Sequence, residues 1–202
     1  MNPWLLVLAA YLLGSFPTSL VVGRMRGIDL RQHGSGNLGA TNTFRVLGWR
    51  AALPVFVVDI LKGWFPVFAF PHWDGMASAN WALAYGAAAI IGHVFSAYVR
   101  FKGGKGVATS AGVLLALAPM AVLAGLLIWA ALVFSTGYVS LGSMVAALLL
   151  PMFVYLLQGL GAVFWLTLAL AVFVLFAHRA NLRRLLRGEE HSFKKKKAGL
   201  PG

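Results

Sequence analysis

The chain has 202 residues, of which 60% are hydrophobic and only 11% are charged, and it contains no cysteine. A soluble globular domain keeps about a quarter of its residues charged, so this composition excludes an ordinary soluble enzyme and a disordered chain. The lack of cysteine excludes thiolate catalysis, a disulfide-stapled fold and cysteine-bound zinc or iron–sulfur centres. The sequence therefore predicts an all-α integral membrane protein.

Long apolar segments alternate with short polar stretches along the chain. Clear spans are expected at residues 3–23, 51–71, 80–99, 139–157 and 160–178, each long enough to cross about 30 Å of hydrocarbon. The first segment lacks a basic leader and a small-residue cleavage site, so we expect it to be retained as a span. The apolar stretch 107–136 contains Pro119, which removes a backbone donor and disfavours helix at the residue before it. A break there gives a short helix at about 107–118 and brings the predicted number of transmembrane helices to seven, in a single domain 1–202.

The net charge of +12 is concentrated in three basic clusters, at 24–50, 100–105 and 179–197. With seven spans all three clusters lie on the same side of the membrane, which the positive-inside rule identifies as the cytoplasmic side. With six spans the last cluster, with eight lysines and arginines, would lie outside. A nucleic-acid partner is not expected, because no soluble face remains to carry this charge. We expect the basic tail at 190–202 to be mobile and to contact solvent or lipid headgroups.

The first polar stretch, residues 31–45, combines three glycines with several small hydrogen-bond donors. Such a sequence makes a poor helix but a good nest, in which successive backbone N–H groups converge on an anion. Arg45 adds a planar guanidinium that suits phosphate or carboxylate. The alternative is a flexible connector between two spans, and a glycine-rich loop alone is weak evidence.

The second polar stretch reads Phe-Lys-Gly-Gly-Lys-Gly-Val-Ala-Thr over residues 101–109. It lacks the four-residue spacer of a Walker A loop, so a nucleotide triphosphatase is not predicted. The glycines around Lys105 directly precede the short helix, where a phosphate can lie between the ammonium group and the helix N-terminus. The alternative is a tight turn whose two lysines reach towards the membrane surface.

The third polar stretch begins at His178, at the end of the last span. On a continuing helix, His178, Asn181 and Leu185 share one face, and three arginines share roughly the opposite face. We expect the arginine face to contact anionic headgroups and the His178 face to look into the helix bundle. A purely structural histidine is the alternative.

A few polar residues lie inside the apolar spans. Asp59 and Lys62 are three residues apart on one helix, which favours a mutual ion pair of structural importance. His93 is expected to be a buried, hydrogen-bonded residue, and Ser140 and Ser143 open the sixth span, where they can cap the helix. No metal site is predicted, because no two histidines have the spacing of helical metal ligands.

Six blocks of the chain, in order and over nearly its whole length, resemble the PlsY family of bacterial acyl-phosphate:glycerol-3-phosphate acyltransferases. The blocks are SFPTS (15–19), GSGNLGATNTFR (34–45), DILKG (59–63), FKGGKGVAT (101–109), YVSLGS (138–143) and HRANLRRL (178–185). The resemblance implies a seven-helix, multi-pass enzyme of the bacterial inner membrane whose cytoplasmic loops form the site. It implies acyl transfer from acyl phosphate to the 1-hydroxyl of glycerol 3-phosphate, giving lysophosphatidate and phosphate, the first step of membrane phospholipid synthesis. Neither a cofactor nor a metal is implied, and we expect a monomer in contact with membrane lipids.

The resemblance also implies a role for individual residues. The residues implied in catalysis are Ser35, Arg45, His178 and Asn181. Those implied in binding the acyl phosphate are Gly36, Asn37, Gly39, Ala40, Thr41 and Asn42. Those implied in binding glycerol 3-phosphate are Gly103, Gly104, Lys105, Gly106 and Ser143. Structural roles are expected for Asp59, Lys62 and Glu190.

Two questions stay open at the level of sequence. The proton of the attacking hydroxyl can pass to His178 or to the phosphate of the donor. An acyl-enzyme is not expected, since cysteine is absent and Ser35 has no evident adjacent base. The alternative function is a small phosphate or organophosphate transporter. Two observations argue against a transporter: the polar residues gather on one side of the membrane, and the sequence shows no internal repeat.

Overall fold

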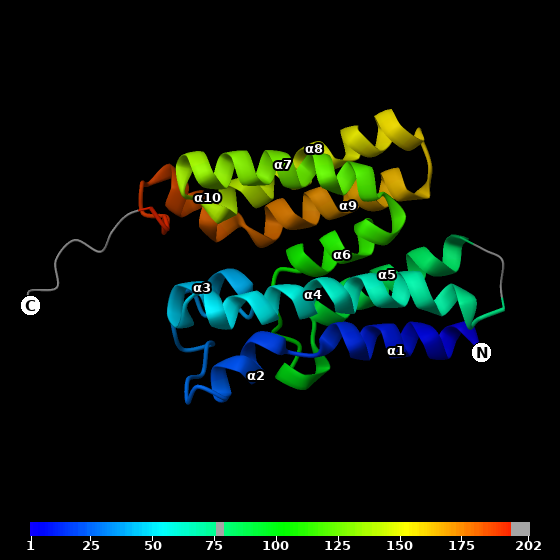
Figure 1. Ribbon diagram of the computed structural model, residues 1–202, viewed down its shortest axis with the longest axis horizontal. Helices are drawn as coiled ribbons and strands as arrows, with labels where there is room; N and C mark the ends of the chain where they lie inside the picture. The colour runs from blue at the N-terminus through cyan, green and yellow to red at the C-terminus, as the bar shows by residue number, and fades with distance from the viewer. Residues whose placement is uncertain (76–78, 195–202) are drawn as a thin grey trace, which may run out of the picture. The chain divides into compact units, whose positions relative to one another are not determined.

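The computed structural model of the protein describes residues 1–75 and 79–194, and helices are the only regular elements within these ranges. Figure 1 shows their order along the chain. The α-helices are α1 (Pro3–Ser15), α2 (Thr18–Arg24), α3 (Ala40–Leu47), α4 (Trp49–Ala69), α5 (Ala79–Val94), α6 (Val107–Leu117), α7 (Pro119–Thr136), α8 (Val139–Gln158), α9 (Ala162–Ala177) and α10 (Arg179–Leu186). Two short 3-10 helices are η1 (Phe70–His72) and η2 (Ala97–Val99). The part of the basic tail at 195–202 lies outside the described residues.

The chain divides into two compact units, Met1–Pro119 and Met120–Gly202. The first unit holds α1 to α6, and the second holds nearly all of α7 together with α8, α9 and α10. The boundary falls at Pro119, where the sequence predicts a break between two helices. The expectation of a single domain over 1–202 stays a prediction.

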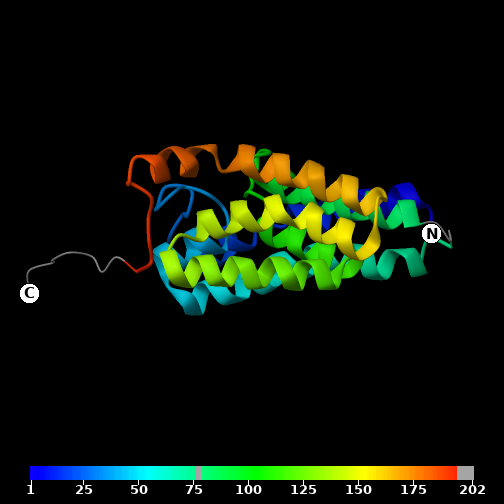
Figure 2. The same cartoon turned by 90° about the horizontal axis from the view of Figure 1, so that it is seen from above.

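In the first unit, α5 packs against α1 and α4, and α4 packs in turn against α6 (Figures 1 and 2). Glycines allow the backbones to approach closely in these pairs. A Cβ atom at Gly14 of α1 would overlap the backbone of Ala89 in α5, and one at Gly112 of α6 would overlap the carbonyl of Ile60 in α4. Small residues at helix contacts are typical of membrane proteins, where van der Waals packing drives association.

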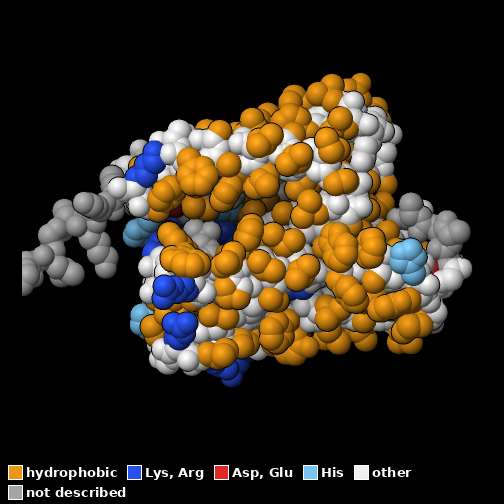
Figure 3. Space-filling view, viewed as in Figure 1, with side chains coloured by type: hydrophobic (Ala, Val, Ile, Leu, Met, Phe, Trp, Pro, Cys, Tyr) orange, Lys and Arg blue, Asp and Glu red, His pale blue; other side chains and the backbone are white. Residues whose placement is uncertain are grey.

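The apolar helices agree with a protein that spans a membrane. Five segments among the described residues are long and apolar enough to cross: Pro3–Arg24, Trp49–His72, Asn80–Val99, Pro119–Thr136 and Val139–Gln158. A sixth is the pair α9 and α10, which is bent by 56°, and α6 is a shorter apolar helix. On the face shown in Figure 3, hydrophobic side chains cover most of the helical surface of each unit. The all-helical membrane fold, with its short helix and its break at Pro119, is confirmed.

The predicted first span holds as the candidate membrane span Pro3–Arg24, but its helix is interrupted, and the helix predicted to continue through His178 is interrupted as well. The first span, 3–23, is broken at Phe16 and Pro17, between α1 and α2. Proline has no N–H to donate, and side chains from other elements bind the carbonyls at this break. The helix through His178 is also not continuous, since α10 turns by 56° away from α9 at that residue. Leu185 therefore does not share one straight helix face with His178.

In the second unit, α8 packs against α9, and the two helices run side by side in Figure 2. At the start of α8, Gly142 faces the carbonyl of Trp129 and the side chain of Val133 in α7. The C-terminal segment returns to this end of the unit, where Glu190 reaches α8 and α10. Polar residues of α8 and α10 are thereby brought together at one end of the second unit.

Candidate functional site

The glycine-rich stretch before α3 is folded by one buried amide, that of Asn42. Its Oδ1 accepts a hydrogen bond from the backbone N–H of Ser35 at 2.8 Å, and its Nδ2 donates to the carbonyls of His33 and Leu30 at 3.0 and 3.2 Å. The Asn42 side chain is only 1% exposed. The prediction that Asn42 binds the acyl phosphate stays a prediction, and the hydrogen bonds show that Asn42 shapes the loop.

The backbone of this loop leaves the ordinary conformations at two glycines. Gly34 has φ +63° and Gly36 has φ +70°, in the left-handed region that favours glycine. Ser35 lies between them and is exposed, whereas Arg45 is half-buried in α3. The alternation of left-handed glycines with small residues gives the loop the irregular backbone expected of an anion nest.

The start of the loop is held by an ion pair outside the membrane-spanning helices. The Arg31 guanidinium donates to both carboxylate oxygens of Asp29, at 2.6 to 3.2 Å. These hydrogen bonds, together with one from the Arg31 backbone, lower the pKa of Asp29 to about 2. The carboxylate therefore stays ionised through the physiological range, and the pair restrains the chain before the glycine nest.

The second glycine-rich stretch folds back onto the end of α5. The backbone N–H of Gly103 donates to the Val94 carbonyl at 2.9 Å, and that of Gly104 donates to the His93 carbonyl at 3.1 Å. A Cβ atom at Gly103 would overlap the His93 carbonyl, so no residue with a side chain fits at this position. Gly106 has φ +78° and immediately precedes α6.

The approach to this loop is a strained stretch of backbone. Arg100 and Phe101 are consecutive non-glycine residues with φ 54° and 60°. The left-handed region costs an L-residue roughly 1–2 kcal/mol, and here the backbone N–H of Phe101 offsets part of this cost by donating to the Ser96 carbonyl at 2.8 Å. Such strain persists where the surroundings fix the chain, and it gathers at functional sites.

The two glycine-rich stretches, far apart in the sequence, meet within the first unit. A Cβ atom at Gly104 would overlap both the carbonyl of Leu38 and the Nε2 atom of His93. Leu38 is itself buried in an apolar cluster with Leu20, Leu30 and Val99. The structure therefore places the nest before α3 next to the loop that carries Lys105, as one site with two anion-friendly backbones requires.

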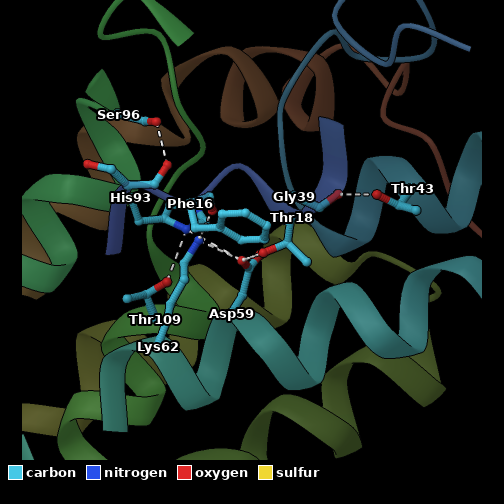
Figure 4. Close-up of polar contacts among 10 residues, drawn as sticks. Phe16, Thr18, Gly39, Thr43, Asp59, Lys62, His93, Ser96 and Thr109 are labelled. Atoms are coloured by element: carbon cyan, nitrogen blue, oxygen red, sulfur yellow. Dashed lines mark hydrogen bonds and ion pairs between the residues drawn. The ribbon is translucent and has the colours of Figure 1, made fainter. Parts of the chain in front are cut away.

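Beneath this junction lies a buried polar cluster, drawn in Figure 4. Lys62 Nζ lies 2.7 Å from Asp59 Oδ1, and both side chains are almost fully buried. Lys62 also donates to the Phe16 carbonyl at 2.9 Å, and Thr18 donates to Asp59 at 3.1 Å. Asp59 and Lys62 thus form the ion pair that their spacing predicts, and they bind the broken first span to α4.

A small pocket opens at the same place. Its lining combines residues of the α1–α2 break, the polar cluster and both glycine-rich stretches: Ser15, Phe16, Pro17, Thr18, Ser19, Leu38, Asp59, Lys62, His93, Ser96, Val99, Gly103 and Gly104. The Oγ atom of Ser15 is buried and has no hydrogen-bond partner among the described residues. This pocket and its polar lining could not be found from sequence, because its walls come from five separate segments.

The remaining predicted site residues lie in the second unit. His178 stands at the bend between α9 and α10 and is 4% exposed, with its Nδ1 atom 2.9 Å from the Val174 carbonyl. Since a carbonyl can only accept, Nδ1 carries the proton in this hydrogen bond, and in the neutral ring Nε2 is then the basic nitrogen.

Glu190 organises the other polar side chains of this end. Its Oε1 atom accepts from Asn181 at 2.7 Å and from Ser140 at 2.9 Å, and its Oε2 atom accepts from Arg184 at 2.7 Å. Burial alone would raise the pKa of Glu190, but these three hydrogen bonds outweigh it, and the pKa is lowered. The predicted catalytic residue Asn181 therefore has its amide direction set by a buried carboxylate.

Ser143, which the family resemblance implies in binding glycerol 3-phosphate, is hydrogen-bonded within the second unit. Its hydroxyl donates to the Val139 carbonyl at 2.9 Å and accepts from Trp129 Nε1 at 3.3 Å. Sequence reasoning missed Trp129, which lies in an apolar helix with no motif around it. Binding of glycerol 3-phosphate by Ser143 stays a prediction.

Within the described residues, no three histidine, aspartate or glutamate side chains gather where they could hold a metal ion. The site is instead built from glycine-rich backbone, hydroxyl and amide groups, and cations. Arg45 and Lys105, half-buried beside the two stretches, supply positive charge to the first unit. This arrangement is suited to anionic substrates, whose charge it can offset.

Comparisons with known proteins agree with this chemistry. The sequence model of a family described as glycerol-3-phosphate acyltransferase matches residues 4–188. A glycerol-3-phosphate acyltransferase of Geobacter sulfurreducens is 43% identical over 194 residues, which cover 96% of this chain and 99% of that protein. One of Halalkalibacterium halodurans is 45% identical over 200 residues, which cover 96% of this chain and 97% of that protein.

Solved structures are similar as well. The crystal structure of PlsY (YgiH), an integral membrane glycerol 3-phosphate acyltransferase, in its glycerol 3-phosphate form has a TM-score of 0.88 and 37% identity, with 95% of each chain covered. Its lysophosphatidic acid form has a TM-score of 0.85 and 36% identity, again with 95% of each chain covered. The family match, the identity over almost the full length and the shared membrane fold lead to one conclusion: this chain belongs to the glycerol-3-phosphate acyltransferase family.

Proposed function

We propose that the protein transfers an acyl group from acyl phosphate to the 1-hydroxyl of glycerol 3-phosphate, giving lysophosphatidate and inorganic phosphate. The observation that carries the proposal is the meeting of two glycine-rich backbones at Leu38 and Gly104 within the first unit. Two anions must be held side by side for this reaction, and their repulsion must be offset by donors and cations. Family membership supports the acceptor, because the relatives are named for acylation of glycerol 3-phosphate.

The reaction needs little beyond positioning and charge stabilisation. The acceptor hydroxyl oxygen attacks the carbonyl carbon of the mixed anhydride, and a C–O bond forms. The bond between that carbon and the phosphate oxygen then breaks, and phosphate leaves with the electron pair. Because phosphate is a good leaving group, electrostatic stabilisation is a large part of the catalysis. No cofactor takes part in this scheme.

We assign the nest before α3 to the acyl phosphate, with Ser35 and Arg45 essential for its reaction. The loop with Lys105 is assigned to glycerol 3-phosphate. His178 and Asn181 are assigned to the same reaction, and Glu190 to holding Asn181. The attacking hydroxyl's proton goes to Nε2 of His178 or to the donor phosphate, and the hydrogen bond from Nδ1 to the Val174 carbonyl gives His178 the tautomer that a base needs.

The test uses purified protein in lipid with palmitoyl phosphate and glycerol 3-phosphate, without added metal, and follows the acylated product by mass spectrometry, which is lysophosphatidate in the assay and monopalmitoylglycerol in the control. Glycerol replaces glycerol 3-phosphate in the control, because it keeps the reacting hydroxyl and removes the anion. We expect product with glycerol 3-phosphate and almost none with glycerol. Folded protein that makes no product but carries labelled glycerol 3-phosphate into sealed vesicles would instead be a transporter.

A covalent acyl-enzyme is not part of the proposal. Ser35 is exposed beside left-handed glycines and donates its backbone N–H to Asn42, and its hydroxyl is assigned to binding the substrate. We expect Ser35→Ala to lower the rate while the protein stays folded. An acyl adduct on Ser35, detected by peptide mass spectrometry during turnover, would show the assignment to be wrong.

We place the site on the cytoplasmic side of the bacterial inner membrane, because the basic loops lie there under the positive-inside rule. The natural lack of cysteine permits a direct test with single cysteines. Gln32→Cys lies in the basic loop and His72→Cys lies after α4, and both positions are exposed. A membrane-impermeant maleimide applied to intact cells should label His72→Cys and spare Gln32→Cys. The opposite pattern would invert the proposed topology.

A further inference from the structure

His93 lies at the point where the loop carrying Lys105 is anchored. It is in the last turn of α5 and 8% exposed, and its carbonyl accepts the backbone N–H of Gly104 at 3.1 Å. The His93 ring packs directly against the same glycine, since a Cβ atom at Gly104 would overlap Nε2. The next carbonyl, of Val94, accepts the N–H of Gly103. One turn of α5 thus contacts the loop through both backbone and side chain.

The ring is also fixed to the far end of the loop. His93 Nδ1 and Thr109 Oγ1 are hydrogen-bonded at 3.0 Å, and Thr109 lies in the first turn of α6 and is fully buried (Figure 4). Asp59 Oδ1 lies 3.8 Å from the same nitrogen and is itself paired with Lys62. The His93 ring therefore ties together the helix before the loop, the helix after it and the buried ion pair of α4.

We propose that His93, through Thr109, is a positioning residue that sets the affinity of the 103–106 loop for glycerol 3-phosphate. The inference rests on the proposed function of that loop. Lys105 follows Gly104 directly, so a shift of Gly104 moves the Lys105 ammonium group relative to a bound phosphate. The attraction between the ammonium group and a phosphate weakens as the distance between them grows, and it is stronger at a half-buried site than in bulk water. A loosened loop therefore weakens substrate binding even where the protein remains folded.

The variants separate positioning from simple stability. His93→Leu keeps an apolar side chain of moderate size and loses the hydrogen bond, and Thr109→Val does the same from the other side. His93→Asn and Thr109→Ser keep a group able to pair with the remaining partner. The matched control is Tyr85→Phe, two turns earlier in α5, which removes a buried hydrogen bond from Tyr85 to Asp74 at 2.7 Å. The Tyr85 hydroxyl bonds to Asp74, and no hydrogen bond among the described residues joins it to the 103–106 loop.

We expect His93→Leu and Thr109→Val to raise KM for glycerol 3-phosphate about tenfold, which corresponds to about 1.4 kcal/mol. KM for acyl phosphate should change much less, and the Asn and Ser variants should recover most of the affinity. Tyr85→Phe should lower thermal stability without a change in either KM. An equal rise of both KM values in His93→Leu, or a Tyr85→Phe effect of the same kind, would overturn the inference.

Hydrogen exchange gives a readout that does not depend on activity. In His93→Leu the amides of Gly103 and Gly104 should lose protection, whereas Tyr85→Phe should leave them protected. Unchanged protection in folded His93→Leu overturns the positioning role, whatever the enzyme does. If wild-type protein fails to acylate glycerol 3-phosphate, the proposed function fails by itself, and the exchange result still decides whether His93 positions the loop.

Discussion

Removal of the Lys62 side chain tests how the polar cluster supports the fold. In Lys62→Met the buried Asp59 carboxylate loses its partner at 2.7 Å and keeps the hydrogen bond from Thr18, with His93 Nδ1 at 3.8 Å. The Phe16 carbonyl at the helix break also loses its side-chain donor. Breaking a buried ion pair from one side costs about 3–5 kcal/mol, because a charge remains uncompensated. We expect a loss of this size in the free energy of unfolding.

The double variant Asp59→Asn/Lys62→Met separates the charge from the contact. It removes both charges of the pair and leaves the Phe16 carbonyl without its side-chain donor, and an unsatisfied buried polar group costs about 1–3 kcal/mol. The double variant should therefore be more stable than Lys62→Met alone. Unfolding is followed in detergent by tryptophan fluorescence, with Lys102→Met, at an exposed loop position, as the control. A Lys62→Met variant that unfolds like the control, or a double variant that is the least stable of the three, would show that Lys62 does not compensate the Asp59 charge.

Three further substitutions have defined outcomes. Arg45→Lys should reduce kcat/KM for acyl transfer at least tenfold, because an ammonium group cannot replace bidentate donation, and steady-state kinetics with near-normal values would remove Arg45 from the site. Gly112→Ala should destabilise the protein by about 1–3 kcal/mol, because the added Cβ atom overlaps the Ile60 carbonyl. Gly125→Ala is the control and should unfold like the wild type, because the added Cβ atom would lie at an ordinary 3.4 Å from the nearest atom, in Leu150. The lowered pKa of Glu190 means that its stabilisation is present above the ordinary glutamate pKa and is lost as pH falls towards the folded-state pKa. Thermal unfolding between pH 6 and 3 should therefore show an acid-dependent loss that Glu190→Gln lacks.

The sequence predicts those features that depend on local pattern. The charge-free segments predict the membrane helices, and the i, i+3 spacing predicts the ion pair between Asp59 and Lys62. Pro119 ends one helix and starts another, as expected. A proline alone is not enough, however, since Pro54 and Pro151 lie inside uninterrupted helices. At Pro119 the positive-inside rule also favours a break, because a break there places all three basic clusters on the same side of the membrane.

Features that depend on distant partners were not predictable. The break at Phe16 needs donors from α4 and from the segment after α5, Lys62 and Ser96, to bind its free carbonyls. The serines and threonines around Pro17 are a local sign of an irregular backbone, but the sequence does not show which distant side chains bind its carbonyls. The contact between Leu38 and Gly104 joins stretches 66 positions apart, and it can be found only once the helices are packed. The roles of individual site residues follow from the family resemblance, because local pattern alone does not separate a substrate ligand from a residue that shapes the loop.

The identity of the acyl donor is the centre of this account. The decisive measurement supplies reconstituted protein with glycerol 3-phosphate and either palmitoyl phosphate or palmitoyl-CoA, and quantifies lysophosphatidate and inorganic phosphate together. We predict equal amounts of both products from palmitoyl phosphate and no lysophosphatidate from palmitoyl-CoA. Lysophosphatidate formed from palmitoyl-CoA would contradict the account, because the nest before α3 would then have no acyl phosphate to bind.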